Sequence, residues 1–127
     1  MSIDFLLDLE RDLERGKDVF GCPAIAKNQW ELARTPEELQ KTANRVAQQK
    51  RLPVNICRLI HISQIIGENM FLVPIKIGDP GPRGEQNVQW ATVETQEAAE
   101  MMRDVRHGTP PIFRLDVEET IAAPESE

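Results

Sequence analysis

Residues 30–59, WELARTPEELQKTANRVAQQKRLPVNICRL, set out a pattern that residues 90–115, WATVETQEAAEMMRDVRHGTPPIFRL, follow a second time. Each stretch opens with a Trp-x-x-x-x-Thr-x-Glu string, continues through a helix-like run and closes on Ile-x-Arg-Leu, although the chain contains only two Trp. Upstream of each, a Phe stands three residues before a Pro, in FGCP (20–23) and FLVP (71–74). Self-similarity of this kind indicates repeated structural units. We therefore interpret the chain as two ββαβ-like units, an internal duplication.

The alternative is that two strand–helix–strand units resemble each other without a common origin. Aligning the matches requires three different offsets, and each free gap makes chance agreement easier. Two copies cannot form a solenoid, which needs about three or more units to bury a continuous core. Both interpretations predict one compact domain.

Composition places the chain among ordinary globular proteins. It has 127 residues, of which 40% are hydrophobic and 28% charged, and its net charge is −6. This balance argues against a broad basic surface for nucleic acid or anionic membranes. No apolar run reaches the roughly 18 residues that span a bilayer, and the N-terminus is acidic from Asp4, unlike a secretory signal. We expect a cytoplasmic protein with no membrane partner and no nucleic-acid partner.

Three helices are expected from apolar periodicity and capping signals. The first covers 3–15, with Leu6, Leu9 and Leu13 on one face and Gly16 as its stop. The second begins at Thr35-Pro36, where Glu38 completes a capping box. Its apolar stripe, and that of the third helix after Thr95, comprise Leu39, Ala43, Val46 and Ala47, and Ala98, Met101, Met102 and Val105. Asp104 and His107 on the third helix are interpreted as a surface ion pair.

Strands are expected at 24–26, 30–33, 54–63, 70–77, 87–93 and 112–117. The 54–63 strand should be central because both its faces carry apolar residues, although a helical turn at 60–66 is an alternative. The 70–77 strand should lie at an edge or carry a bulge, because Pro74 cannot donate to a ladder. The predicted fold is α+β, with an N-terminal helix, two ββαβ-like units, one mainly antiparallel sheet and the helices on one face. Residues 1–117 form the domain, and 118–127 a flexible acidic tail.

The search for catalytic chemistry finds no constellation that would carry a reaction. Cys57 and His61 share a strand face but lie about 13 Å apart, too far for a nucleophile and its base, unless the segment is helical. Cys22 and Cys57 are expected as buried free thiols, with a disulfide as the alternative. Two His and no closely spaced Cys pair argue against zinc, and no phosphate-loop or dinucleotide motif occurs. We expect no enzyme activity, no cofactor and no metal.

The first functional hypothesis rests on residues 78–86, GDPGPRGEQ, an exposed loop with three Gly, two Pro and no apolar side chain. Long loops in small domains carry function or are disordered. We expect an adaptor or inhibitor that binds a protein partner through Asp79, Arg83 and Glu85 and through the adjacent sheet edge. Its oligomeric state is left open, with a homo-oligomer as one alternative.

The second hypothesis concerns Arg58 and Arg114, which interrupt apolar strands at equivalent places in the two units. Paired guanidiniums could hold an anionic small molecule. The alternative is that each Arg faces solvent or a helix carboxylate. A third hypothesis, an enzyme with Cys57 as nucleophile, predicts rapid alkylation of that thiol; we expect slow alkylation, because an apolar strand raises a thiol pKa.

Overall fold

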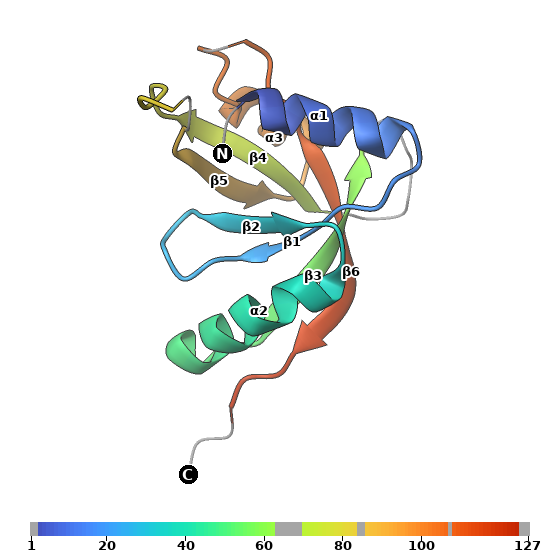
Figure 1. Cartoon of the computed structure of the whole chain (residues 1–127), viewed down its shortest axis with the longest axis vertical. Coiled ribbons are helices and arrows are strands. Elements are labelled where there is room, and N and C mark those ends of the chain that lie inside the picture. The colour runs from blue at the N-terminus through green and yellow to red at the C-terminus, as the bar shows by residue number, and fades with distance from the viewer. Residues whose placement is uncertain (1–2, 63–69, 84–85, 107, 125–127) are drawn as a thin grey trace.

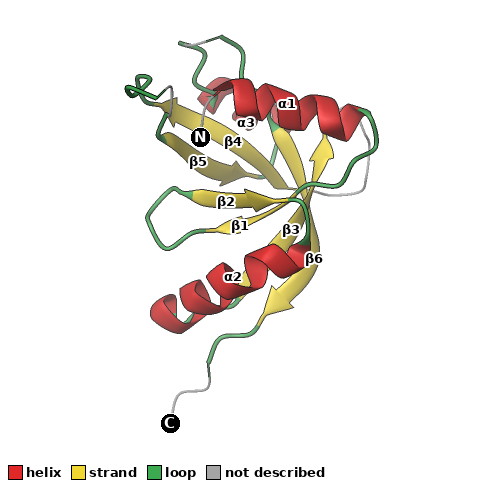
Figure 2. Cartoon of the chain, in the orientation of Figure 1, coloured by secondary structure: helices red, strands yellow, loops and turns green. Residues whose placement is uncertain are grey.

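The computed structural model describes residues 3–62, 70–83, 86–106 and 108–124. The three helices of the described residues are separated along the chain by groups of strands, as Figure 1 and Figure 2 show. The elements in chain order are α1 (Ile3–Glu14), β1 (Phe20–Pro23), β2 (Trp30–Ala33), α2 (Pro36–Lys50), β3 (Val54–His61), β4 (Met70–Ile77), β5 (Val88–Val93), α3 (Gln96–Met102) and β6 (Phe113–Ile121).

All six strands belong to one sheet, in the order β2-β1-β3-β6-β4-β5. Every pair of neighbouring strands is antiparallel. The predicted α+β class with a single sheet is therefore confirmed. β3 and β6 form the centre of the sheet, and β2 and β5 form its two edges.

The strand predictions need three changes. The strand expected at 24–26 is wrong: β1 covers Phe20–Pro23, where it pairs with β2 and β3, and residues 24–29 form the β1–β2 turn. β3 is central, as its apolar faces predict, whereas the predicted edge position of β4 is wrong because β4 lies between β5 and β6. The alternative bulge is present, since the β4–β5 register shifts between Pro74 and Lys76. β6 runs to Ile121, so its last four residues lie in the stretch expected to begin the tail. The strand extends there because residues 119–121 pair with the start of β3.

Capping decides where the two later helices begin. Pro36 occupies the first turn of α2, and the Glu38 carboxylate accepts a hydrogen bond from the Arg34 N–H at 3.1 Å, although the Thr35 side chain makes no cap bond. In α3 the Thr95 hydroxyl accepts from the Ala98 N–H at 3.1 Å. The expected apolar stripe of α2 is buried.

The third helix is shorter than its apolar spacing predicts. α3 ends at Met102, and Met101 and Val105, expected on its buried face, are exposed. The physical reason is a tertiary contact: the Asp104 N–H donates to the Pro74 carbonyl of β4 at 2.9 Å, which draws the chain out of helical geometry. The expected helical position of Asp104 is wrong, because Asp104 follows the end of α3. Its predicted ion pair with His107 involves a residue outside the described ranges.

Asp104 is a buried carboxylate that fastens this turn to the sheet. It accepts from the Ile77 N–H at 2.8 Å and from the Arg106 guanidinium at 2.9 Å. Arg106 also donates to the Ile77 carbonyl at 3.2 Å. The Arg106 guanidinium holds the pKa of the Asp104 carboxyl well below its ordinary value. The ion pair thus joins the end of β4 to the chain that follows α3.

Replacing Asp104 tests this role. The Asp104→Asn variant should lose about 2 kcal/mol of unfolding free energy at neutral pH, because hydrogen bonds to a charged group weaken. The folded-state pKa lies below the unfolded value of 3.8, so the contribution is complete well above that value and disappears as the pH falls through it and below. Urea unfolding at several pH values measures this, with exposed Asp8→Asn as control. A pH-independent difference between wild type and Asp104→Asn would contradict the assignment.

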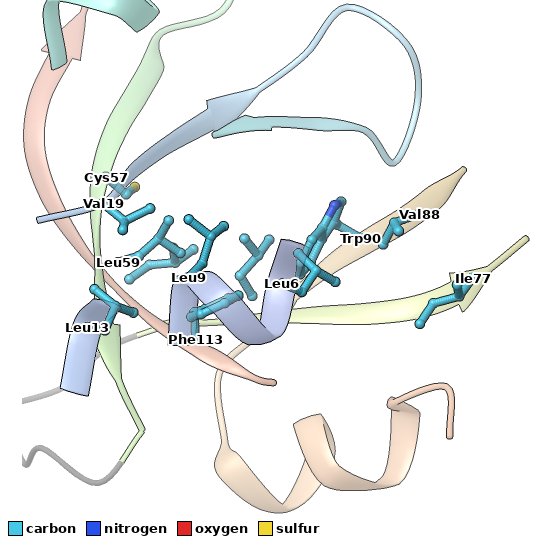
Figure 3. Packing of buried hydrophobic residues seen from close by; sticks show 12 residues of the cluster. Leu6, Leu9, Leu13, Val19, Cys57, Leu59, Ile77, Val88, Trp90 and Phe113 are labelled. Carbon is cyan, nitrogen blue, oxygen red and sulfur yellow. The ribbon is translucent and has the colours of Figure 1, made fainter. Parts of the chain in front are cut away.

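The helices cover both faces of the sheet, so the prediction that they pack on one face is wrong. Phe71 and Val73 of β4 pack with α3, whereas Leu72, which points to the opposite face, packs with α1. α2 packs on the same face as α3, over Phe20 of β1. The N-terminal helix takes the opposite face because its stripe of Leu6, Leu9 and Leu13 meets the large side chains there, among them Trp90 (Figure 3).

The sheet curls strongly around α1. The Asn28 carbonyl, in the β1–β2 turn, accepts from the Trp90 N–H of β5 at 2.7 Å, although β2 and β5 are opposite edges of the sheet. The Gln29 and Asn87 side chains are also hydrogen bonded, at 3.1 Å. Gly21 leaves room for its cross-strand partner, since a Cβ there would lie 2.8 Å from a Leu32 methyl carbon. We call the side that carries α1 the concave face.

No helix within the described ranges is long and apolar enough to cross a bilayer.

Candidate functional site

The loop predicted to bind a partner connects β4 to β5. Asp79 and Arg83 are exposed on it, and Glu85 lies outside the described residues. Its base is closed by the Gly78 N–H, which donates to the Asn87 carbonyl at 3.0 Å.

Gln86 holds the same loop to the first helix. Its side chain is buried, donates to the Gly78 carbonyl at 3.1 Å and accepts from the Ile3 N–H at 3.0 Å. Sequence reasoning placed Gln86 in an exposed loop and missed this role, since nothing local indicates a contact with the N-terminal helix. The base of the loop is therefore anchored, while Asp79 and Arg83 face solvent.

The sheet edge next to this loop is β5, and it is partly occupied by the chain itself. The Trp90 N–H already donates to Asn28. An added strand needs a row of unpaired backbone groups. A partner strand pairing at β5 would therefore have to displace the β1–β2 turn.

Arg58 lies on the face that carries α2 and α3. Its guanidinium is 2.7 Å from Asp18 and 3.5 Å from Glu118, and it stacks 5.1 Å from the centre of the Phe20 ring. These contacts match the alternative in which each Arg meets a carboxylate of the chain.

Arg114 lies on the same face, one strand away. Ile60 pairs with Arg114 and Arg58 with Asp116, so the two arginines are diagonal neighbours, about 7–8 Å apart at the backbone. The Arg114 Nε donates to the Ile62 carbonyl at 3.0 Å, and the guanidinium stacks 5.2 Å from the Phe71 ring centre. The two side chains thus turn outward, each to the Phe of its own half. Neither lines the cavity described next.

A cavity of about 490 Å³ opens on the concave face, beside the part that α1 covers, and reaches the end of α2, which contributes Val46 and Lys50 to its wall. We call it the concave cavity. All six strands contribute to its wall. Its lining residues are Pro23, Trp30, Val46, Lys50, Leu52, Pro53, Val54, Asn55, Cys57, Met70, Thr92, Leu115, Asp116 and Val117.

Strand register explains how these residues meet. Cys57 pairs with Val117, and Met70 pairs with Leu115, so each pair points to the same face of the sheet. Cys57 and Leu115 also belong to the cluster packed under α1, which places the cavity directly next to that helix. The strands that carry this floor are separated in sequence by up to sixty residues, and only the curled sheet brings them together.

The chemistry of the cavity is mainly apolar. Leu52, Met70 and Val117 at its rim are 60%, 45% and 55% exposed. Polar groups are few, and the side-chain amide oxygen (Oδ1) of Asn55 already accepts a hydrogen bond from the Thr120 hydroxyl at 2.9 Å. Cavities of a few hundred Å³ with apolar walls are typical of binding sites, and exposed apolar surface marks sites of interaction. The arrangement suits an apolar group far better than an ion.

The two thiols are free and buried, as expected. Burial raises the pKa of Cys57 to about 11 and that of Cys22 to about 12. A thiol in this state is a poor nucleophile near neutral pH. The predicted cytoplasmic location stays a prediction. Among the described residues, no cluster of three or more His, Cys, Asp or Glu could hold a metal ion.

Alkylation kinetics test the state of Cys57. In a Cys22→Ser variant, iodoacetamide should label Cys57 roughly 100-fold more slowly at neutral pH than in urea, because a two-unit rise in pKa lowers the thiolate fraction about a hundredfold. The rate should rise steadily up to about pH 11. Mass spectrometry of timed samples gives both rates. Complete labelling of the folded protein within minutes at pH 7 would revive the nucleophile hypothesis.

Comparison with known proteins returns no matching family model, no matching curated protein and no matching solved structure.

Proposed function

We propose that this chain is a small non-enzymatic protein-interaction module, an adaptor or inhibitor, and that a partner inserts apolar side chains into the concave cavity. The observation that carries the proposal is the pair of rim residues Met70 and Val117, which stand exposed at the mouth of an apolar cavity. Small domains rarely leave such surface uncovered without a binding role. A cavity surrounded by exposed apolar side chains favours a macromolecule over a small molecule, which would leave that rim in water.

The loop hypothesis remains as a second contact surface of the same module. Asp79, Arg83 and Glu85 would meet the partner there, together with the adjacent edge. The Asn28–Trp90 hydrogen bond weighs against the edge, but nothing covers the exposed Arg83 side chain among the contacts described. Met70 and Ile77 are the two ends of β4, so the cavity and the loop are far enough apart to be altered separately.

Anion binding by Arg58 and Arg114 has less support. The Arg58 charge is matched by Asp18 and Glu118, and both guanidiniums stack on Phe rings. An incoming anion would have to compete with these contacts. A thermal-shift screen with nucleotides, phosphosugars and carboxylic acids tests this alternative, since a ligand at 100 times its Kd stabilises by about 2.7 kcal/mol.

We also propose that the two halves arose by internal duplication. The repeat predicts that Phe20, Pro23 and Arg58 correspond to Phe71, Pro74 and Arg114. In the sheet, Phe20 pairs with Arg58 and Phe71 pairs with Arg114, so corresponding residues occupy corresponding registers. Each Arg also stacks on the Phe of its own half at nearly the same distance. Chance similarity of two strand–helix–strand units would not require these matches.

Site-specific photocrosslinking tests the proposed partner site. A photoreactive amino acid is placed at Val117 in the cavity, at Arg83 in the loop and, as a control, at the exposed Lys41 of α2. Irradiation in living cells should give a discrete crosslinked protein from position 117 and none from position 41. Crosslinks from position 83 alone would move the partner to the loop. Crosslinks from neither position would overturn the interaction function.

A further inference from the structure

The position of the concave cavity corresponds to the position of α1 in the other half of the sheet. The strand order of the sheet is β2-β1-β3-β6-β4-β5. If β1, β2 and β3 are exchanged with β4, β5 and β6, the same order results, read from the opposite edge of the sheet. The registers agree as well: Pro23 pairs with Trp30, and Pro74 pairs with Trp90. The two halves of the concave face can therefore be compared residue by residue.

The centre of this exchange lies at the Leu59–Leu115 pair. These two residues correspond to each other in the repeat and also pair with each other across β3 and β6. A twofold rotation about this pair would therefore place each residue of one half on its counterpart in the other half. Six residues of the cavity wall and their counterparts are Trp30 and Trp90, Cys57 and Phe113, Met70 and Val19, Thr92 and Leu32, Leu115 and Leu59, and Val117 and His61.

The counterparts of these six wall residues are residues that α1 contacts. Four of them share one buried cluster with Leu6, Leu9 and Leu13 of α1, and a fifth packs against it; these are Trp90, Phe113, Val19, Leu59 and Leu32. Figure 3 shows Leu6, Leu9 and Leu13 of α1 in one cluster with Trp90 and Phe113. One half of the concave face is thus a helix-binding surface already in use.

The sixth counterpart, His61, contacts α1 through its imidazole. Its Nε2 lies 3.2 Å from a Glu14 carboxylate oxygen and 3.7 Å from one of Glu10. The helix therefore contacts the counterparts of all six of these wall residues, five by packing and the sixth through the His61 imidazole.

We propose that the concave cavity receives an amphipathic helix of a partner protein, bound as α1 binds the equivalent half of the sheet. This inference rests on the proposed interaction function and names the structure of the partner segment. The helix presents three apolar side chains at i, i+3 and i+7, the spacing of Leu6, Leu9 and Leu13.

Differences between the two halves define what the partner helix carries. Cys57 stands where Phe113 stands under α1, so the cavity leaves room for a larger apolar side chain at that point. Val117 replaces His61, so an acidic residue in the place of Glu14 would find an apolar wall instead of an imidazole. The partner helix should be apolar there, because burying an unpaired carboxylate is costly.

A second copy of this chain does not supply such a helix from its described residues. Leu6 and Leu9 of α1 are fully buried in their own groove, and the apolar stripe of α2 is buried against the sheet. α3 has seven residues and ends at exposed Met101 and Met102, too short for an i to i+7 stripe. The chemistry of the cavity therefore points to a helix from another protein.

A synthetic peptide with the sequence of residues 3–16, and with Glu14→Leu, is the probe. We expect saturable one-to-one binding to the full chain by titration calorimetry. Binding should weaken at least about tenfold, or 1.4 kcal/mol, for the protein variant Val117→Asp and for the peptide variant Leu9→Asp. The unaltered peptide, which retains Glu14, should bind more weakly than the Glu14→Leu peptide. Val105→Asp, an exposed site outside the cavity, is the matched protein control.

Each contrary result has a distinct meaning. Binding that Val117→Asp leaves unchanged would show that the peptide occupies another surface or replaces α1, and would overturn the inference. No binding by the peptide, with crosslinking at position 117 retained, would overturn the helix but leave the interaction function standing. Self-association of the protein that Val117→Asp abolishes, seen by sedimentation, would make a second copy the occupant and also overturn the inference.

Discussion

The packing of α1 into the curled sheet is the interaction on which the rest of the structure depends. Leu6 and Leu9 lose essentially all their exposure against residues from β3, β4, β5 and β6. The curl is closed by the Asn28–Trp90 hydrogen bond, which joins the turn of one edge hairpin to the strand at the other edge. The curl leaves space for one layer of helix on the concave face. A helix of twelve residues, α1, covers only part of that face. The concave cavity is the remainder.

This constraint also explains the surfaces at either end of the molecule. Near the β4–β5 loop, the curl pairs the Trp90 N–H with the Asn28 carbonyl and brings Gln86 against the start of α1. Hydrogen bonds therefore anchor that region. At the opposite end of β4, the same curl gathers apolar side chains such as Met70 and Val117 outside the part that α1 covers, where the end of α2 adds Val46 and Lys50 to the wall. A receptor site and its occupied counterpart thus arise from one sheet geometry.

Local signals in the sequence predict most of the elements, because each signal acts over a few residues. The leucine spacing of α1, the Thr35-Pro36 start of α2 and the Thr95 cap of α3 all lie where the structure has them. Long-range contacts decide the features that were missed. α3 stops early because Asp104 binds β4, and this contact joins positions far apart in sequence. Alternation along a strand indicates which residues share a face, but it cannot indicate which helix covers that face.

The candidate site illustrates the same limit. Arg58 and Arg114 were singled out because they interrupt apolar strands, and the structure uses both in contacts within the chain. The cavity residues carry no such signal, since Cys57, Met70 and Val117 read as ordinary core positions until the sheet is curled. The repeat did contain the necessary information, because it matches each of these residues to one beneath α1.

Methyl NMR of methionine-labelled protein, with the Glu14→Leu peptide added, tests the central claim most directly. Met70 lies in the cavity wall, whereas Met101 and Met102 are exposed on α3, so the protein carries its own controls. The account predicts that the Met70 methyl signal shifts progressively with peptide while the signals of Met101 and Met102 stay in place. A peptide that binds without moving Met70 would contradict it.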